Sequence, residues 1–164
     1  MARIVREACC MTAQESNITV SRTIDASTKD LFEVLTLPAR HQEFDGSGMV
    51  RSDEKSQRIQ QVGDVFVMNM QNDRFGDYRM HNHVIAYADN KLVGWQPAPE
   101  ARKDSPDGWE WVYELEAIDA ASTKVTLTYD WSKVEDEKVR AVFPAISEKQ
   151  LEESLNLLAA AAAS

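Results

Sequence analysis

The chain has 164 residues and a formal net charge of -9, from 27 acidic and 18 basic side chains. Its length suits one domain with a substantial core, so we expect no second domain. The acidic charge repels phosphate backbones and anionic lipid surfaces, which argues against nucleic acid as a partner. No apolar run reaches the roughly 18 residues that a membrane-spanning helix requires, so we expect no membrane span.

The first residues, Met1 to Cys10, lack the continuous apolar core of a secretory signal peptide. We predict a flexible leader over residues 1–16 and one folded domain over 17–164, with Met11 as an alternative translation start. The two cysteines, Cys9 and Cys10, are adjacent and offer neither a disulfide framework nor metal-site spacing. This cysteine usage favours a reducing, cytoplasmic location.

The folded part opens with an alternating segment from Asn17 to Asp25, which predicts a first strand. Ser27 then offers a helix N-cap before a compact apolar stripe over 29–35. Pro38 ends this helix and is tolerated in the first turn of a second short helix, which runs to about Phe44. Two short helices are thus expected after the first strand.

Residues 49–134 alternate between strand-like runs and turn residues without a helical stripe, and this pattern predicts an antiparallel meander. The stretch from Pro97 to Gly108 carries three prolines among charged residues and is expected to be a longer loop. The strands of the meander are predicted over about 49–53, 64–71, 77–87, 92–96, 109–118 and 124–134.

The last part of the chain is predicted to be helical, and Pro144 divides it. The acidic residues 135–137 suit the positive end of a first helix. After Pro144, an apolar stripe that includes Leu151, Leu155 and Leu158 predicts a long final helix laid across the sheet.

Two of the predicted strands, over 109–118 and 124–134, alternate strictly and place aromatic side chains on one face. Trp111 and Tyr113 share a side in the first strand, and Tyr129 and Trp131 share a side in the second. Such an aromatic wall suits either an ordinary core or a pocket for a flat apolar ligand. The pattern alone leaves both interpretations open.

The order of elements and the wording of two segments resemble the helix-grip fold of the START-related and birch-pollen-allergen-like (SRPBCC) superfamily. Residues 18–35 (ITVSRTIDASTKDLFEVL) and 37–44 (LPARHQEF) resemble the opening strand and helices of its polyketide cyclase/dehydrase-like members. The resemblance implies an α+β fold, with a curved antiparallel sheet of about seven strands wrapped around a long C-terminal helix. It also implies a hydrophobic cavity between sheet and helix that opens near the loops at one end.

We predict that aromatic, methionine and amide side chains of the inner sheet face line this cavity. Methionines add adaptable, polarizable surface, and the Asn82 amide could orient a ligand carbonyl or bond a neighbouring group. The predicted ligand-binding residues are Phe66, Met68, Met70, Tyr78, Met80, Asn82, Trp95, Trp109, Trp111, Tyr113, Tyr129 and Trp131.

The histidines His81 and His83 share the strand face opposite to Asn82. Two histidines at this spacing could bind a metal, but no motif supplies a third ligand, and we predict neither a metal site nor a cofactor. Should the opposite parity face inward, these histidines become the interior candidates. Arg22 interrupts the apolar side of the first strand and is expected to pair with a polar group or to extend to water.

The leading functional hypothesis is the binding of a small hydrophobic molecule, aromatic, polyketide-like or lipid, by a monomer or homodimer. One alternative is a polyketide cyclase/dehydrase-type enzyme that uses the same cavity. His83 and Tyr113 are its candidate acid–base residues, although neither has a visible partner that would tune its pKa. Another alternative is a protein-interaction module like the activators of a heat-shock chaperone ATPase. The superfamily has no universal catalytic signature to transfer, because carriers, cyclases and chaperone cofactors share its scaffold.

Overall fold

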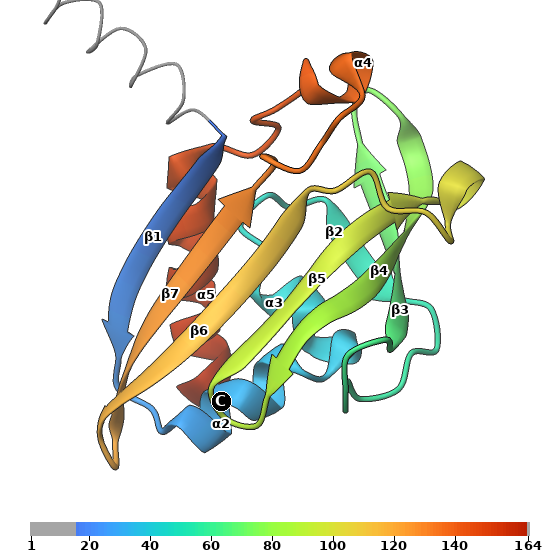
Figure 1. Cartoon of the computed structure of the whole chain (residues 1–164). Coiled ribbons are helices and arrows are strands. Elements are labelled where there is room, and N and C mark those ends of the chain that lie inside the picture. The colour runs from blue at the N-terminus through green and yellow to red at the C-terminus, as the bar shows by residue number, and fades with distance from the viewer. Residues whose placement is uncertain (1–15, 164) are drawn as a thin grey trace, which may run out of the picture.

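Seven antiparallel strands form one curved sheet in the order β1-β7-β6-β5-β4-β3-β2 (Figure 1). The computed structural model describes residues 16–163, so nearly all of the predicted leader lies outside the described residues. The strands are β1 (Asn17–Ile24), β2 (Val50–Asp53), β3 (Val65–Asn72), β4 (Gly76–Ala88), β5 (Leu92–Pro99), β6 (Glu110–Asp119) and β7 (Ser122–Asp130).

The helices lie against the concave face of this sheet. Helix α2 (Thr28–Leu35) begins after Ser27, whose side chain accepts a hydrogen bond from the Asp30 backbone N–H, as a helix cap does. The 3-10 turn η1 (Pro38–Arg40) leads directly into α3 (His41–Phe44). The long helix α5 (Glu148–Ala163) crosses behind β1 and β7 (Figure 1). This architecture confirms the predicted α+β helix-grip fold.

Two strand boundaries differ from the prediction. β7 ends at Asp130 rather than near Val134, because the Asp130 carboxylate accepts a hydrogen bond from the Ser132 N–H and turns the chain. β5 continues to Pro99, through a stretch that its prolines predicted to be a loop. Beyond Trp95, β5 pairs with β4 alone, and a proline is tolerated at such an open edge because its missing N–H faces no strand.

The segment that leads from β7 to α5 is less helical than predicted. Its helix α4 is confined to Glu137–Arg140 and is capped by Asp136, whose carboxylate accepts hydrogen bonds from the Lys138 and Val139 N–H groups. The short 3-10 helix η2 (Glu100–Arg102) follows β5. Figure 1 shows that residues 131–147 and the η2 loop lie at the same end of the sheet.

The core lies between the sheet and the helices. Helix α5 buries Leu151, Leu155 and Leu158 almost completely. The turn after α3 is fixed to α5 at Gly46, whose backbone N–H donates to the Ser154 hydroxyl at 2.9 Å. A Cβ atom on Gly46 would lie only 2.1 Å from a backbone oxygen of α5, so this close approach requires glycine. Within residues 16–163, no helix is long and apolar enough to cross a membrane.

Candidate ligand-binding site

The predicted ligand-binding residues all lie on the concave face of the sheet. Phe66 pairs with Asn82 across β3 and β4, and Trp95 pairs with Trp111 across β5 and β6, so the inner parity continues from strand to strand. Those that are buried are Phe66, Met68, Asn82, Trp95, Tyr113, Tyr129 and Trp131, and those that keep partial exposure are Met70, Tyr78, Met80, Trp109 and Trp111. Their role in binding stays a prediction.

An inner aromatic cluster, made of His41, Phe44, Phe66, Trp95 and Tyr113, forms where α3 meets the sheet. The centre of the His41 ring lies 4.9 Å from that of Phe44, 5.0 Å from Phe66 and 5.1 Å from Trp95. Trp95 in turn stacks on Tyr113, with 5.9 Å between the ring centres. An imidazole is thus enclosed by aromatic rings beneath α3.

His41 is neutral at physiological pH. Its Nε2 lies 2.7 Å from the Leu35 carbonyl oxygen, which can only accept, so Nε2 carries the proton and donates. Burial lowers the pKa of His41 to about 4, although the hydrogen bond to Leu35 and the charge of Asp45 oppose this shift. Sequence reasoning missed His41 because one histidine in a four-residue helix has no periodic signal. The available sign was its spacing of three residues from Phe44, which puts both rings on one helix face.

Two further polar side chains are buried on the same face. The Asn82 amide is 4% exposed and donates to the carbonyl oxygens of Phe66 and Met80, at 3.4 and 3.3 Å. Tyr113 is 3% exposed, and burial raises the pKa of its phenol above the ordinary value, so the hydroxyl stays protonated. No hydrogen bond joins that hydroxyl to another described residue, and no fully buried side-chain oxygen or nitrogen of the described residues lacks a partner, so the hydroxyl oxygen itself keeps some exposure. It is therefore available to a ligand.

An outer aromatic cluster, made of Trp109, Trp111, Tyr129, Trp131 and Phe143, lies at the end of the sheet near α4. Trp111 stacks on Tyr129 with 4.3 Å between ring centres, and Trp131 stacks on Phe143 at 6.0 Å. Phe143 also lies 5.3 Å from Trp109. Phe143 belongs to the 131–147 segment, so a loop residue, not a helix, covers these rings. It was not predicted, because it stands in a stretch without periodicity.

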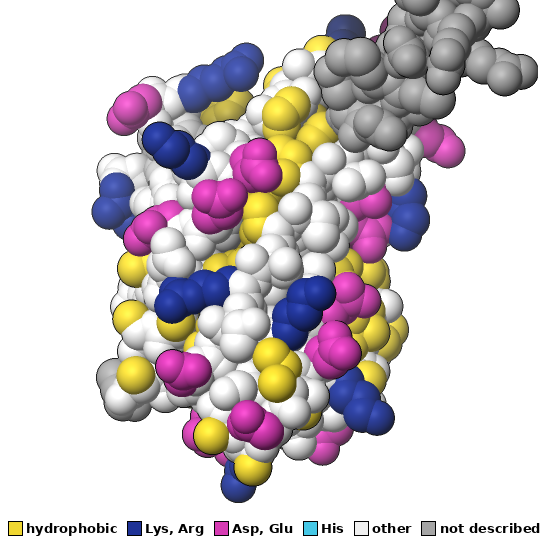
Figure 2. Space-filling view, turned by 90° about the vertical axis from the view of Figure 1, so that its left-hand side faces the viewer, with side chains coloured by type: hydrophobic (Ala, Val, Ile, Leu, Met, Phe, Trp, Pro, Cys, Tyr) yellow, Lys and Arg dark blue, Asp and Glu magenta, His cyan; other side chains and the backbone are white. Residues whose placement is uncertain are grey.

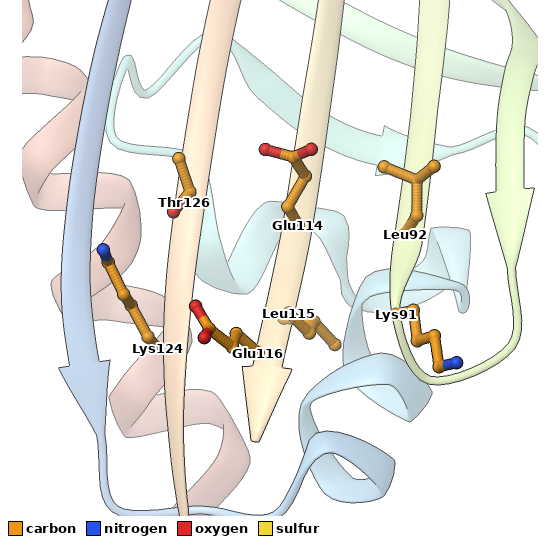
Figure 3. A pocket seen from close by; sticks show the side chains of 7 residues that line it. All are labelled: Lys91, Leu92, Glu114, Leu115, Glu116, Lys124 and Thr126. Atoms are coloured by element: carbon orange, nitrogen blue, oxygen red, sulfur yellow. The ribbon is translucent and has the colours of Figure 1, made fainter. Parts of the chain in front are cut away.

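The space between sheet and α5, where the resemblance implies a cavity, is packed with the side chains of these two clusters and of α5. Two hollows lie elsewhere on the described surface. One is a groove of about 410 Å³ between β1 and α5. The other is a depression of about 320 Å³ on the convex face (Figure 3), where Glu114, Glu116 and Lys124 make the lining charged. Neither is the expected apolar cavity.

The histidines of β4 lie on the face opposite to Asn82. His81 Nε2 contacts the Glu100 carboxylate, and His83 Nε2 lies 2.6 Å from the Lys103 carbonyl oxygen. Both side chains hold the η2 loop against the sheet. His83 and Tyr113, the two predicted acid–base candidates, are therefore on opposite faces and do not form one site. Among residues 16–163, no group of three or more His, Cys, Asp or Glu side chains is placed to hold a metal ion.

The comparisons with known proteins agree with this fold. A family model described as "Activator of Hsp90 ATPase homolog 1-like protein" matches residues 25–163. Uncharacterized protein Rv0088 of Mycobacterium tuberculosis is 36% identical over 115 residues, which cover 68% of this chain and 47% of that protein. The chain thus spans about half the length of the curated relatives it matches.

Solved structures share the architecture at low sequence identity. A protein from Arthrobacter aurescens has a TM-score of 0.66 at 13% identity, over 92% of this chain and 87% of that chain. The Zhui aromatase/cyclase from Streptomyces sp. R1128 has a TM-score of 0.63 at 14% identity, over 90% of this chain and 93% of that chain. These neighbours and the family model confirm the resemblance to the helix-grip superfamily. At such identities the structural likeness shows the fold alone.

Proposed function

The chain belongs to the Activator of Hsp90 ATPase homolog 1-like family, and from this premise we propose that it binds a small aromatic or otherwise apolar molecule on the concave face of its sheet. The observation that carries the proposal is Tyr113, whose side chain is 3% exposed within an aromatic cluster and whose hydroxyl, which keeps some exposure, makes no hydrogen bond to another described residue. A ligand hydroxyl or carbonyl would satisfy it. The surrounding rings supply flat apolar surface for the rest of the ligand.

Entry would take place through the outer aromatic cluster. Phe143 packs against Trp109, Tyr129 and Trp131, and its own ring is only partly buried. A planar ligand that displaces Phe143 would stack on the same neighbouring faces, so the ligand would replace the apolar packing that the Phe143 ring provides. Displacement of Phe143 needs movement of the 131–147 segment, and the ligand must then reach the Tyr113 hydroxyl past side chains of the inner cluster, while the sheet and α5 stay in place.

Apolar burial would supply most of the affinity, at about 25 cal/mol for each Å² of apolar surface removed from water. The Tyr113 hydroxyl would mainly fix orientation, since one neutral hydrogen bond contributes about 0.5–1.5 kcal/mol. This division predicts a tolerant site that prefers flat rings and discriminates modestly between ligands with and without a polar group.

The test is a titration followed by tryptophan fluorescence, with 2-naphthol and naphthalene as planar probes that differ in one hydroxyl. We expect saturable binding of both probes at one equivalent. Tyr113→Phe should weaken 2-naphthol binding about two- to tenfold and leave naphthalene binding unchanged, because only one hydrogen bond is lost. Phe143→Ala should strengthen the binding of both probes. Phe75→Ala, which removes a phenylalanine that is 65% exposed outside the clusters, is the matched control and should change neither. The absence of saturable binding to both probes would contradict the proposal.

A cyclase/dehydrase-type enzyme is a second candidate, and His41 is the observation that favours it. A neutral imidazole within an aromatic cage has a lone pair on Nδ1 that could accept a proton from a bound substrate. Its pKa of about 4 makes it a weak base at neutral pH, which ranks this candidate below simple binding. Loss of turnover with retained probe binding in His41→Gln would support the enzyme.

A protein-interaction module is the remaining candidate, and the packed interior favours it. In this case the outer surface would carry the function, and the aromatic clusters would be core alone. Recovery of a chaperone ATPase by the immobilised chain, together with no response to either naphthalene probe, would move the assignment to this candidate.

A further inference from the structure

Strand β1 forms one margin of the sheet, and Figure 1 shows no described element beyond it. The Trp131 N–H donates to the Ser16 carbonyl oxygen at 2.8 Å, just before β1 begins. In an antiparallel ladder, every second residue of a strand bonds to the neighbouring strand through its backbone. The backbone N–H and C=O groups of the even-numbered residues of β1 therefore point toward β7. The backbone N–H and C=O groups of Asn17, Thr19, Ser21 and Thr23 must therefore point to the open edge.

Two of these residues, Thr19 and Ser21, belong to the lining of the groove of about 410 Å³ between β1 and α5. Thr19 and Ser21 line it on the strand side, and Leu155, which is almost fully buried, lies at its floor. On the helix side the groove is lined by Glu148, Glu152 and Asn156. Figure 2 looks onto this side of the molecule, where acidic and basic side chains flank patches of apolar surface.

The charges of the groove leave it with an excess of acid. Its one basic side chain, Arg22, donates from Nη1 to the Asn156 side-chain oxygen at 2.8 Å and so lies at one end of the groove. Glu148 and Glu152 lie one helical turn apart toward the other end, and neither forms an ion pair with another described residue. The unpaired acidic wall lies beside the free backbone groups of Thr19 and Ser21.

We propose that this groove binds an extended, basic peptide segment of a partner protein, which adds as a strand along β1. The free N–H and C=O groups of β1 would bond the peptide backbone, as in other cases of strand addition. Alternate side chains of an added strand lie about 6.6 Å apart, which is close to the rise of one helical turn. Lysine or arginine at alternate positions would therefore reach Glu148 and Glu152. This inference does not depend on the proposed ligand site.

A second copy of this chain suits the edge less well than a basic peptide. Antiparallel pairing of β1 with the β1 of another copy would bring the Glu148 and Glu152 side chains of both α5 helices toward one seam. Like charges at such a seam oppose association, whereas a basic segment neutralises them. The edge also lacks the lysine or proline that often protects a free strand from pairing.

The test uses a capped, fluorescein-labelled peptide of sequence Thr-Lys-Thr-Lys-Thr-Lys-Thr, with fluorescence anisotropy and the full chain. The same peptide with glutamate in place of lysine is the charge control. We expect saturable binding of the lysine peptide that weakens as salt is raised, and no binding of the glutamate peptide. Amide hydrogen exchange should slow at Thr19 and Ser21 when the lysine peptide is present.

Matched variants separate strand addition from general attraction between opposite charges. Ser21→Pro keeps the net charge and removes one free edge N–H without a ladder bond to β7, so it should weaken binding about tenfold, whereas Ser21→Ala should not. Glu152→Gln should weaken binding about two- to fivefold, whereas Glu153→Gln, an exposed neighbour outside the groove, should have no effect. If Ser21→Pro fails to fold, the comparison of Glu152→Gln with Glu153→Gln still distinguishes binding in the groove from attraction to the overall charge.

Three outcomes would overturn the proposal. The first is the absence of saturable binding of the lysine peptide. The second is equal weakening by Glu152→Gln and Glu153→Gln, which would show binding to overall charge. The third is a dimer in sedimentation that Ser21→Pro dissociates, which would assign the β1 edge to a second copy of the chain.

Discussion

The inner and outer aromatic clusters share one face of one sheet, but different elements cover them. α3, anchored to α5 at Gly46, lies over the inner cluster and leaves its members buried. The 131–147 segment covers the outer cluster with a single phenylalanine, and Trp109, Trp111 and Phe143 stay partly exposed. The inner cluster also encloses the imidazole of His41, whereas the outer cluster contains no histidine.

This difference separates two roles that one continuous aromatic wall would otherwise combine. Rings held under a helix contribute mainly to stability, because their burial does not depend on a loop. Rings held under a loop can be uncovered without unfolding the sheet, since local opening separates only a few packed side chains. The inner cluster should therefore dominate the free energy of unfolding, and the outer cluster should control access to the concave face.

The largest expected effect is the loss of stability in Trp95→Ala, and Trp111→Ala is the matched substitution in the outer cluster. Trp95→Ala should lower the free energy of unfolding by about 3–5 kcal/mol, because it removes a buried ring and leaves a cavity. Trp111→Ala removes a partly exposed ring and should cost clearly less. Urea unfolding followed by circular dichroism measures both. Equal losses in the two variants would contradict the division between the clusters.

The pH dependence of stability tests the inner cluster through His41. Its pKa is about 4 in the folded chain and 6.5 as a free side chain, so the unfolded chain binds the proton more readily. The stabilising contribution is complete above pH 6.5 and is lost as the pH falls to about 4, by about 3 kcal/mol. His41→Gln should flatten this part of the stability profile. A profile with the same slope in both proteins would contradict the burial of a neutral imidazole.

A smaller effect is expected at Phe143. Phe143→Ala should cost about 1–2 kcal/mol of unfolding free energy, because its ring is only partly buried. Phe44→Ala, the matched substitution in the inner cluster, should cost more, since Phe44 is 4% exposed. The loss of Phe143 should also increase acrylamide quenching of tryptophan fluorescence. Unchanged quenching would show that Phe143 does not cover the outer cluster.

The inner parity of the strands could be predicted from sequence because a strand with one buried face repeats every two residues. Along β6, Tyr113 and Leu115 are buried, and the residues that alternate with them, Glu114 and Glu116, are exposed, as the sequence pattern predicts. The prediction of a loop from Pro97 onward, which rested on its prolines, failed at the end of β5. The effect of Pro97 depends on whether a neighbouring strand is present, and sequence alone does not reveal the neighbour.

The two residues that distinguish the clusters were not predictable in the same way. His41 and Phe143 lie in a four-residue helix and in a loop, where no repeat marks the inward face. Their positions depend on tertiary contacts, such as the hydrogen bond from His41 to the Leu35 carbonyl. The predicted candidates His81 and His83 had a clear strand parity, and the structure places them on the convex face, opposite to Asn82.

Native mass spectrometry of the chain purified from its own host tests the central claim most directly. We predict a stoichiometric adduct of a small apolar molecule that is released on denaturation and can be identified in the extract. Replacement of Tyr113 by phenylalanine should reduce its occupancy. A clean mass of the chain alone, with no thermal shift across a panel of aromatic and lipid ligands, would contradict the account and leave both clusters as core.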